Sequence, residues 1–155
     1  MVTFVPIDLL HDSILPYLSV RDLQSLDTAF TNKDLRPHLR NLWKSYKYEC
    51  MDETISSGEL SWLCECGVEI VAVAVKESDL LLSLVPQMPL LKQFHCEGCV
   101  NNEMLNCLAE NCAQLEILRI GRGRYSESGL ISVAQHCHQL HTISWDSYLI
   151  PDAII

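Results

Sequence analysis

The second half of the sequence repeats itself with a period of about two dozen residues, and this repetition limits the possible folds more than any other feature. One apolar pattern, with spacings of three and two, begins at Val68, Leu91, Leu115 and Leu140, so the intervals are 23, 24 and 25 residues. The last part of each copy alternates between apolar and other residues, as a half-buried strand does. Repetition at a fixed period indicates an array of similar structural units.

A second recurring piece lies between these copies. Residues 104–112 and 129–137 are 25 positions apart and share apolar residues at helical spacings of three and four, an alanine and a final cysteine. A strand followed by a helix in each unit predicts an α/β fold. One unit cannot bury its own apolar face, so the units are expected to stack into a short solenoid.

The array is expected to occupy residues 67–155 as about four repeats, the last one incomplete. Residues 78–87 fit the helix of its first unit, shortened by Pro86 and Pro89. Residues 49–66 are interpreted as a junction or a degenerate repeat, with a helix over residues 55–66. Apolar residues run to the last position, so the tail folds over the open end, a partner covers it, or the chain is a fragment.

Residues 1–48 are expected to form a separate head of three short helices. The first begins near Pro6, and its apolar face carries Leu9, Leu10, Ile14, Tyr17 and Leu18, with Pro16 kinking or ending it. Two capping signals, at residues 19–22 and 31–34, open the second and third helices. The apolar residues of these two helices are Leu23, Leu26, Leu35, Leu39, Leu42 and Trp43.

Both regions resemble known families. The string Ile14-Leu-Pro-Tyr-Leu-Ser-Val-Arg-Asp-Leu-Gln-Ser-Leu26 is similar to the middle of an F-box, although residues 30–33 replace the late tryptophan of that family. The repeats, with Gly-Leu, Leu-Ala and Cys before each Leu-x-x-Leu-x-Leu strand, resemble the cysteine-containing leucine-rich repeat. In that family this subtype most often follows an F-box, so the two resemblances agree.

The resemblances imply protein binding without catalysis. F-boxes dock on the adaptor of cullin-type ubiquitin ligases, so the chain is expected to be the substrate-recognition subunit of a ubiquitin ligase complex in ubiquitin-dependent protein degradation. The alternative is a scaffold or recognition protein whose head only caps the solenoid. The residues expected to bind the adaptor are Ile14, Leu15, Tyr17, Leu18, Leu23 and Leu26.

A substrate protein, not identified by the sequence, is expected on the concave sheet of the solenoid. The outward strand positions are aligned as Ala72, His95, Arg119 and Ser144, and the positions two residues further on as Ala74, Glu97, Gly121 and Asp146. Arginine is a common interface anchor. The candidate substrate-binding residues are therefore His95, Glu97, Arg119, Arg122 and Asp146, unless these are merely solvated charges.

The eight cysteines have a structural interpretation within the repeat. Cys112 and Cys137 precede strands, Cys96 faces inward, and Cys99 occupies the position that satisfies turn backbone. Zinc bound by the pairs 64/66 and 96/99 beside His95 is the less favoured alternative, because a Cys-x-Cys spacing is short for zinc. A cysteine nucleophile is also disfavoured, because the histidines at 136 and 138 adjoin Cys137 in sequence. We predict no catalytic residue, metal or cofactor.

Charge and hydropathy exclude several partners. The net charge is −9, and the whole acidic excess lies beyond residue 50, so nucleic acid is not expected as a partner. The segment Gly121-Arg-Gly-Arg124 lacks the Lys-Ser/Thr of a phosphate loop. No run of about 18 apolar residues or secretory signal is found, so we expect no membrane partner and a cytoplasmic or nuclear location with reduced thiols.

Overall fold

The computed structural model describes residues 7–30 and 36–145, and it shows an α/β protein built on a five-stranded parallel sheet. The strands lie in the spatial order β1-β2-β3-β5-β7, so neighbours in the sheet are neighbours along the chain. Their bounds are β1 Lys47–Ile55, β2 Glu69–Val75, β3 Gln93–Cys96, β5 Ile117–Ile120 and β7 Thr142–Trp145.

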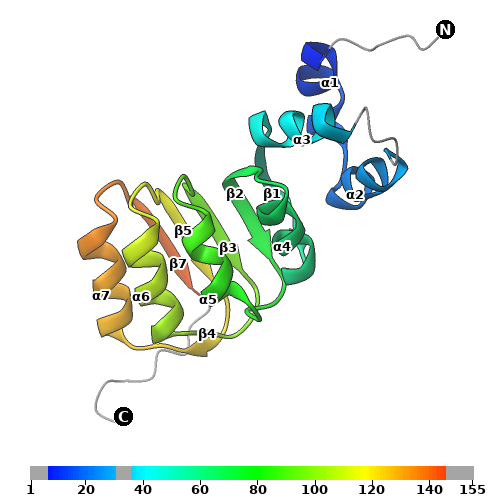
Figure 1. The fold of residues 1–155 in the computed structure, drawn as a ribbon. Helices are drawn as coiled ribbons and strands as arrows, with labels where there is room; N and C mark the ends of the chain where they lie inside the picture. Colours follow the sequence, from blue (N-terminus) through cyan, green and yellow to red (C-terminus); the bar gives the residue numbers. More distant parts are fainter. Residues whose placement is uncertain (1–6, 31–35, 146–155) are drawn as a thin grey trace, which may run out of the picture.

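A row of helices covers one face of this sheet (Figure 1). Each parallel pair of strands needs a crossover connection, and a helix supplies it. The helices are α4 Ser57–Glu65, α5 Leu81–Leu84 with a 3-10 turn Val85–Gln87, α6 Asn102–Asn111 and α7 Glu127–His136. Neighbouring helices contact each other along the row. None of the described helices has the length and apolarity needed to cross a lipid bilayer.

The sheet has a buried face and an open face. On the helix side, Phe94, Cys96, Leu118 and Ile120 are buried among the helices. Successive strand residues point to opposite faces, so His95 and Arg119 lie on the open side and keep solvent contact. The alternation predicted for these strands is therefore present, and it leaves one face without a helix layer in the described residues.

The register differs from the prediction in the first unit. Val73 pairs with Phe94 and Val75 with Cys96, so that interval is 21 residues rather than 23, whereas β3, β5 and β7 follow at 24 and 25. Ala74, not Ala72, therefore lies beside His95. The sequence could not fix this register, because residues 68–75 are apolar at both odd and even positions.

Lateral hydrogen bonds connect equivalent positions of successive units. The Cys112 thiol donates to the Met88 carbonyl at 3.6 Å, and the Cys137 thiol donates to the Cys112 carbonyl at 3.3 Å. Asn102 binds Ser126 through both its amide nitrogen, at 3.0 Å, and its amide oxygen, at 2.9 Å. The prediction that Cys112 and Cys137 are buried thiols that donate to backbone is thus confirmed.

A second pair of strands lies at the turns that leave β3 and β5. Strand β4, Val100–Asn101, pairs in parallel with β6, Gly123–Arg124. A Cβ at Gly121 would lie 2.7 Å from the Glu97 carbonyl oxygen, and one at Gly123 would collide with the Val100 backbone. The glycines of this segment therefore serve close backbone approach between units.

The junction contains a strand and a helix. β1 pairs in parallel with β2, and the predicted junction helix is α4, closed at its start by a capping box of Ser56 and Glu59. The strand β1 was not predicted. Its register jumps from Cys50↔Val73 to Thr54↔Ala74, so residues 51–53 form a bulge at the edge of the sheet.

The N-terminal helices lie beyond the β1 edge (Figure 1). They are α1 Ile7–Ser13, a 3-10 turn Leu15–Tyr17, α2 Val20–Ala29 and α3 Arg36–Ser45. The first helix ends before Pro16, one of the two predicted alternatives, so Tyr17 does not share a buried face with Leu10 and is 84% exposed. The predicted cap at Ser19 and Asp22 is present. Pro6, Leu35 and the predicted cap at residues 31–34 lie outside the described residues.

The N-terminal helices share one buried cluster with the sheet. Trp43 meets Trp62 of α4 edge to face with ring centroids 5.8 Å apart, and the Arg21 guanidinium lies 3.1 Å from the Glu59 carboxylate. The Tyr46 hydroxyl donates to the Leu15 carbonyl at 3.4 Å. These contacts attach the helices to the first strand–helix pair, and the boundary near residue 48 stays a prediction.

Candidate functional site

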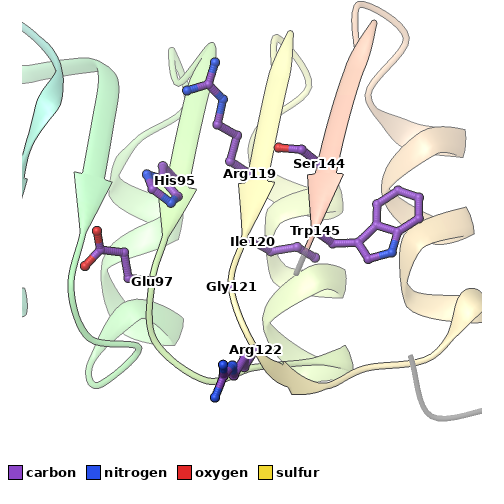
Figure 2. A pocket seen from close by; sticks show the side chains of 8 residues that line it. All are labelled: His95, Glu97, Arg119, Ile120, Gly121, Arg122, Ser144 and Trp145. Atoms are coloured by element: carbon purple, nitrogen blue, oxygen red, sulfur yellow. The ribbon is translucent and has the colours of Figure 1, made fainter. Parts of the chain in front are cut away.

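The open face of the sheet carries most of the residues predicted to bind a substrate. The strand register places His95 beside Arg119 and Arg119 beside Ser144, and Figure 2 shows these side chains on one face of adjacent strands. Glu97 follows β3, and Arg122 lies in the turn after β5. The structure therefore brings His95, Glu97, Arg119 and Arg122 together around one hollow.

This hollow, which we call the arginine hollow, has a volume of about 280 Å³. The residues that line it are His95, Glu97, Arg119, Ile120, Gly121, Arg122, Ser144 and Trp145. Trp145 was predicted only as an inward strand residue, yet its side chain is 42% exposed at the rim. Asp146, the fifth predicted substrate residue, lies outside the described residues.

The two arginines of the hollow are not neutralised by neighbours that the structure describes. Lys92 lies 3.0 Å from Glu116, and Lys47 lies 3.8 Å from Glu69, so two other exposed cations have carboxylate partners. Over residues 7–30 and 36–145, neither Arg119 nor Arg122 has a carboxylate within ion-pair distance. Their guanidinium groups are exposed and able to bind carboxylates of another molecule.

The residues predicted to bind an adaptor divide into exposed and buried groups. Tyr17 and Ile14 are exposed, together with Leu9, and they form apolar surface on the N-terminal helices. Leu18 and Leu26 are only partly buried. Leu15 and Leu23 are fully buried and pack in one cluster with the sheet, so neither side chain is exposed on the surface, and their role in adaptor binding stays a prediction. Sequence spacing alone could not tell an inward leucine from an exposed one.

The thiols are arranged for packing. Burial raises the pKa of Cys96 to about 11 and that of Cys112 to about 12, and burial also raises the pKa of Cys137, so these thiols stay protonated at neutral pH. A protonated buried thiol is a poor nucleophile. Cys99 is exposed, and its predicted role in satisfying turn backbone stays a prediction.

The zinc alternative has no support in the part of the chain that the structure describes. There, no three His, Cys, Asp or Glu side chains converge on a point where they could hold a metal ion. Cys96 is buried in the core, whereas Cys99 is exposed, and burial raises the pKa of both Cys64 and Cys66 to about 11.

Comparisons with known proteins do not assign this chain to a family. No protein-family model matches the sequence, and a search of curated proteins gives no significant match.

Proposed function

We propose that this chain is a protein-interaction module, a short leucine-rich-repeat solenoid with an F-box-like head, that selects substrates for a cullin-type ubiquitin ligase. The repeat assignment is supported by strand–helix units at intervals of 24 and 25 residues and by the thiol hydrogen bonds between successive units. The single observation that carries the binding role is the arginine hollow on the open sheet face, whose guanidinium groups have no ion-pair partner within residues 7–30 and 36–145. The chemistry of ubiquitin transfer belongs to other subunits.

The exposed apolar surface of the head supports docking on a ligase adaptor. Leu9, Ile14 and Tyr17 expose large apolar side chains within residues 9–17 of the head, and exposed apolar patches commonly mark protein interfaces. All eight cysteines are free, which suits the reducing cytoplasm or nucleus.

A second function is favoured by a different observation. The buried cluster runs without interruption from Leu15 and Leu23 into the sheet. A head joined so closely to the first unit would also serve as a cap that covers the end of the solenoid. The chain would then be a scaffold or recognition protein without ligase coupling.

Size-exclusion chromatography with a purified ligase adaptor separates these functions. The ligase subunit should co-elute with the adaptor at micromolar concentration, and Tyr17→Asp should abolish co-elution. Leu82→Asp, at an exposed apolar residue of α5, is the matched control and should leave the complex intact. Absence of a complex, or equal effects of both variants, would favour the cap.

A further inference from the structure

A second and larger hollow lies between the head and the first strand. Its volume is about 930 Å³, and its walls come from residues 16–20 of the head and from residues 46–53 of β1 and its approach. Ala72 of β2 and Gln93 of β3 also line it. None of the predicted substrate-binding residues belongs to this hollow.

Both hollows reach strand β3. Gln93 lines the large hollow and His95 lines the arginine hollow, and these residues are two positions apart on the same strand. They therefore point to the same open face of the sheet. We call the combined surface, from β1 to Trp145 on β7, the sheet groove.

The two ends of the sheet groove carry opposite charge. At the β1 end, the acidic side chains of Glu49, Asp52 and Glu53 line the large hollow, and its one lysine, Lys47, is engaged with Glu69. At the other end lie the guanidinium groups of Arg119 and Arg122, which outnumber the Glu97 carboxylate there and have no ion-pair partner among the described residues.

The floor between these ends is uncharged. The register joins Glu49 to Ala72, Ala72 to Gln93 and Gln93 to Ile117, so no charged residue of these strands interrupts this row. An extended chain can therefore lie across β2, β3 and β5 without meeting a charged side chain in the row.

We propose that the sheet groove binds an extended segment of a partner protein that carries acidic residues at one end and basic residues at the other. This inference rests on the proposed function and specifies the chemistry of its substrate. The acidic end contacts Arg119 and Arg122, and the basic end contacts Glu49, Asp52 and Glu53. From β1 to β5 there are three strand spacings, about 14 Å, which an extended chain spans with about four residues.

An exposed aromatic side chain at the arginine end of the groove fits the same occupant. Trp145 is exposed at the rim of the arginine hollow, and tryptophan is enriched among residues that dominate protein interfaces. Opposite charge at the two ends also fixes the direction of the segment, since reversing it would place like charges together.

Fluorescence anisotropy with the full chain and synthetic peptides at low ionic strength tests the proposal. The probe is a labelled peptide with two glutamates, four serine or alanine residues and two lysines, made in both chain directions. The control is an isomer of the same composition with alternating charges. One direction of the probe should bind roughly tenfold more tightly than the isomer, as a few exposed ion pairs would give.

Variants identify which end of the peptide is bound. Arg119→Glu should weaken the probe and an all-glutamate peptide alike, whereas Asp52→Lys should weaken binding of the probe but not that of the all-glutamate peptide. Arg36→Glu, at an exposed arginine of α3, should change neither. Equal binding of probe and isomer, no effect of Asp52→Lys, or no binding at about 1 mM would overturn the proposal.

The adaptor experiment separates the two proposals. Arg119→Glu and Asp52→Lys should leave the adaptor complex unchanged, because Tyr17 and Ile14 make that contact. A formed adaptor complex without a preference for the probe would refute the sheet groove alone. Preference for the probe without an adaptor complex would instead refute ligase coupling.

Discussion

The strand–helix array and the N-terminal helices differ in how their contacts are organised. In the array, equivalent residues meet equivalent residues, as Met88, Cys112 and Cys137 do in successive units. In the N-terminal helices, each attachment occurs once, as between Trp43 and Trp62 or Arg21 and Glu59. Because its contacts repeat, the array can be predicted from the period of the sequence. The attachment of the N-terminal helices depends on individual residue pairs, which no sequence pattern predicts.

Because the array and the N-terminal helices share one buried cluster, we expect them to unfold together. Leu118 lies in the array and Leu23 in α2, and both are fully buried. We expect Leu118→Ala and Leu23→Ala each to lower the free energy of unfolding by about 3 kcal/mol, because each deletes buried methyl groups and leaves a cavity. Urea unfolding followed by tryptophan fluorescence and far-UV circular dichroism should show one coincident transition for both.

A separate early transition in Leu23→Ala would contradict this expectation. It would mean that the helices form an independent unit, as the predicted boundary near residue 48 implies. Leu82→Ala, at an exposed leucine, is the control and should leave the midpoint nearly unchanged.

The thiol hydrogen bonds offer a smaller test of the array. Cys112→Ala should destabilise the fold by about 1 kcal/mol, because it removes a buried sulfur and its bond to the Met88 carbonyl. Cys99→Ala, at an exposed thiol, is the matched control and should have no measurable effect. The denaturant midpoints of the two variants are compared with that of the parent chain. Equal shifts for Cys112→Ala and Cys99→Ala would mean that the repeated thiol contact contributes nothing to stability.

The same thiols should differ in reactivity. With a thiol-specific reagent near neutral pH, Cys99 should be labelled in the folded protein, whereas Cys112 should be labelled only after unfolding, because it is buried and its pKa is about 12. Mass spectrometry of the labelled peptides reads both sites in one experiment. Labelling of Cys112 at the rate of Cys99 would show that the array opens easily.

Changing the contact between Arg21 and Glu59, which attaches the N-terminal helices to α4, should have the smallest effect on stability, and this effect should depend on pH. Burial raises the pKa of Glu59, but hydrogen bonds from Ser56 and the charge of Arg21 lower it more, so the pKa falls below its ordinary value of 4.5. A lowered pKa adds stability above 4.5 that is lost as pH falls through the folded value.

Glu59→Gln should therefore destabilise the protein slightly at neutral pH, by less than about 1 kcal/mol after solvent screening. The difference from the parent chain should shrink as the pH falls below 4.5 toward the lowered pKa of Glu59. Thermal midpoints measured across this range provide the test. A difference that does not change with pH would exclude the carboxylate charge as its origin.

Much of the array could be predicted from sequence. The strands near Phe94, Leu118 and Ile143 and the helices that follow the first two lie where the period placed them, because burial on one face imposes alternation. The first interval was wrong, because apolar residues at both parities leave the register of β2 open. β1 was missed, because the sequence KYECMDETI is rich in charge and contains a bulge.

The candidate site was predictable only in part. Alternation places Arg119 and His95 on the open face, and the structure brings them together with Glu97 and Arg122. The large hollow was not foreseen, because it depends on how the head lies against β1 and on no local pattern. Trp145 was missed because its strand is the last of the described sheet, where an inward position is not necessarily covered.

The bulge in β1 has a consequence for how copies of this protein behave in concentrated solution. An exposed sheet edge with a regular row of backbone N–H and C=O groups invites another strand and leads to aggregation. In β1, residues 51–53 interrupt that row, and the edge carries the charges of Glu49, Asp52 and Glu53. Like charges and a broken ladder make edge-to-edge growth unfavourable, so β1 should resist the strand addition that a flat parallel sheet permits.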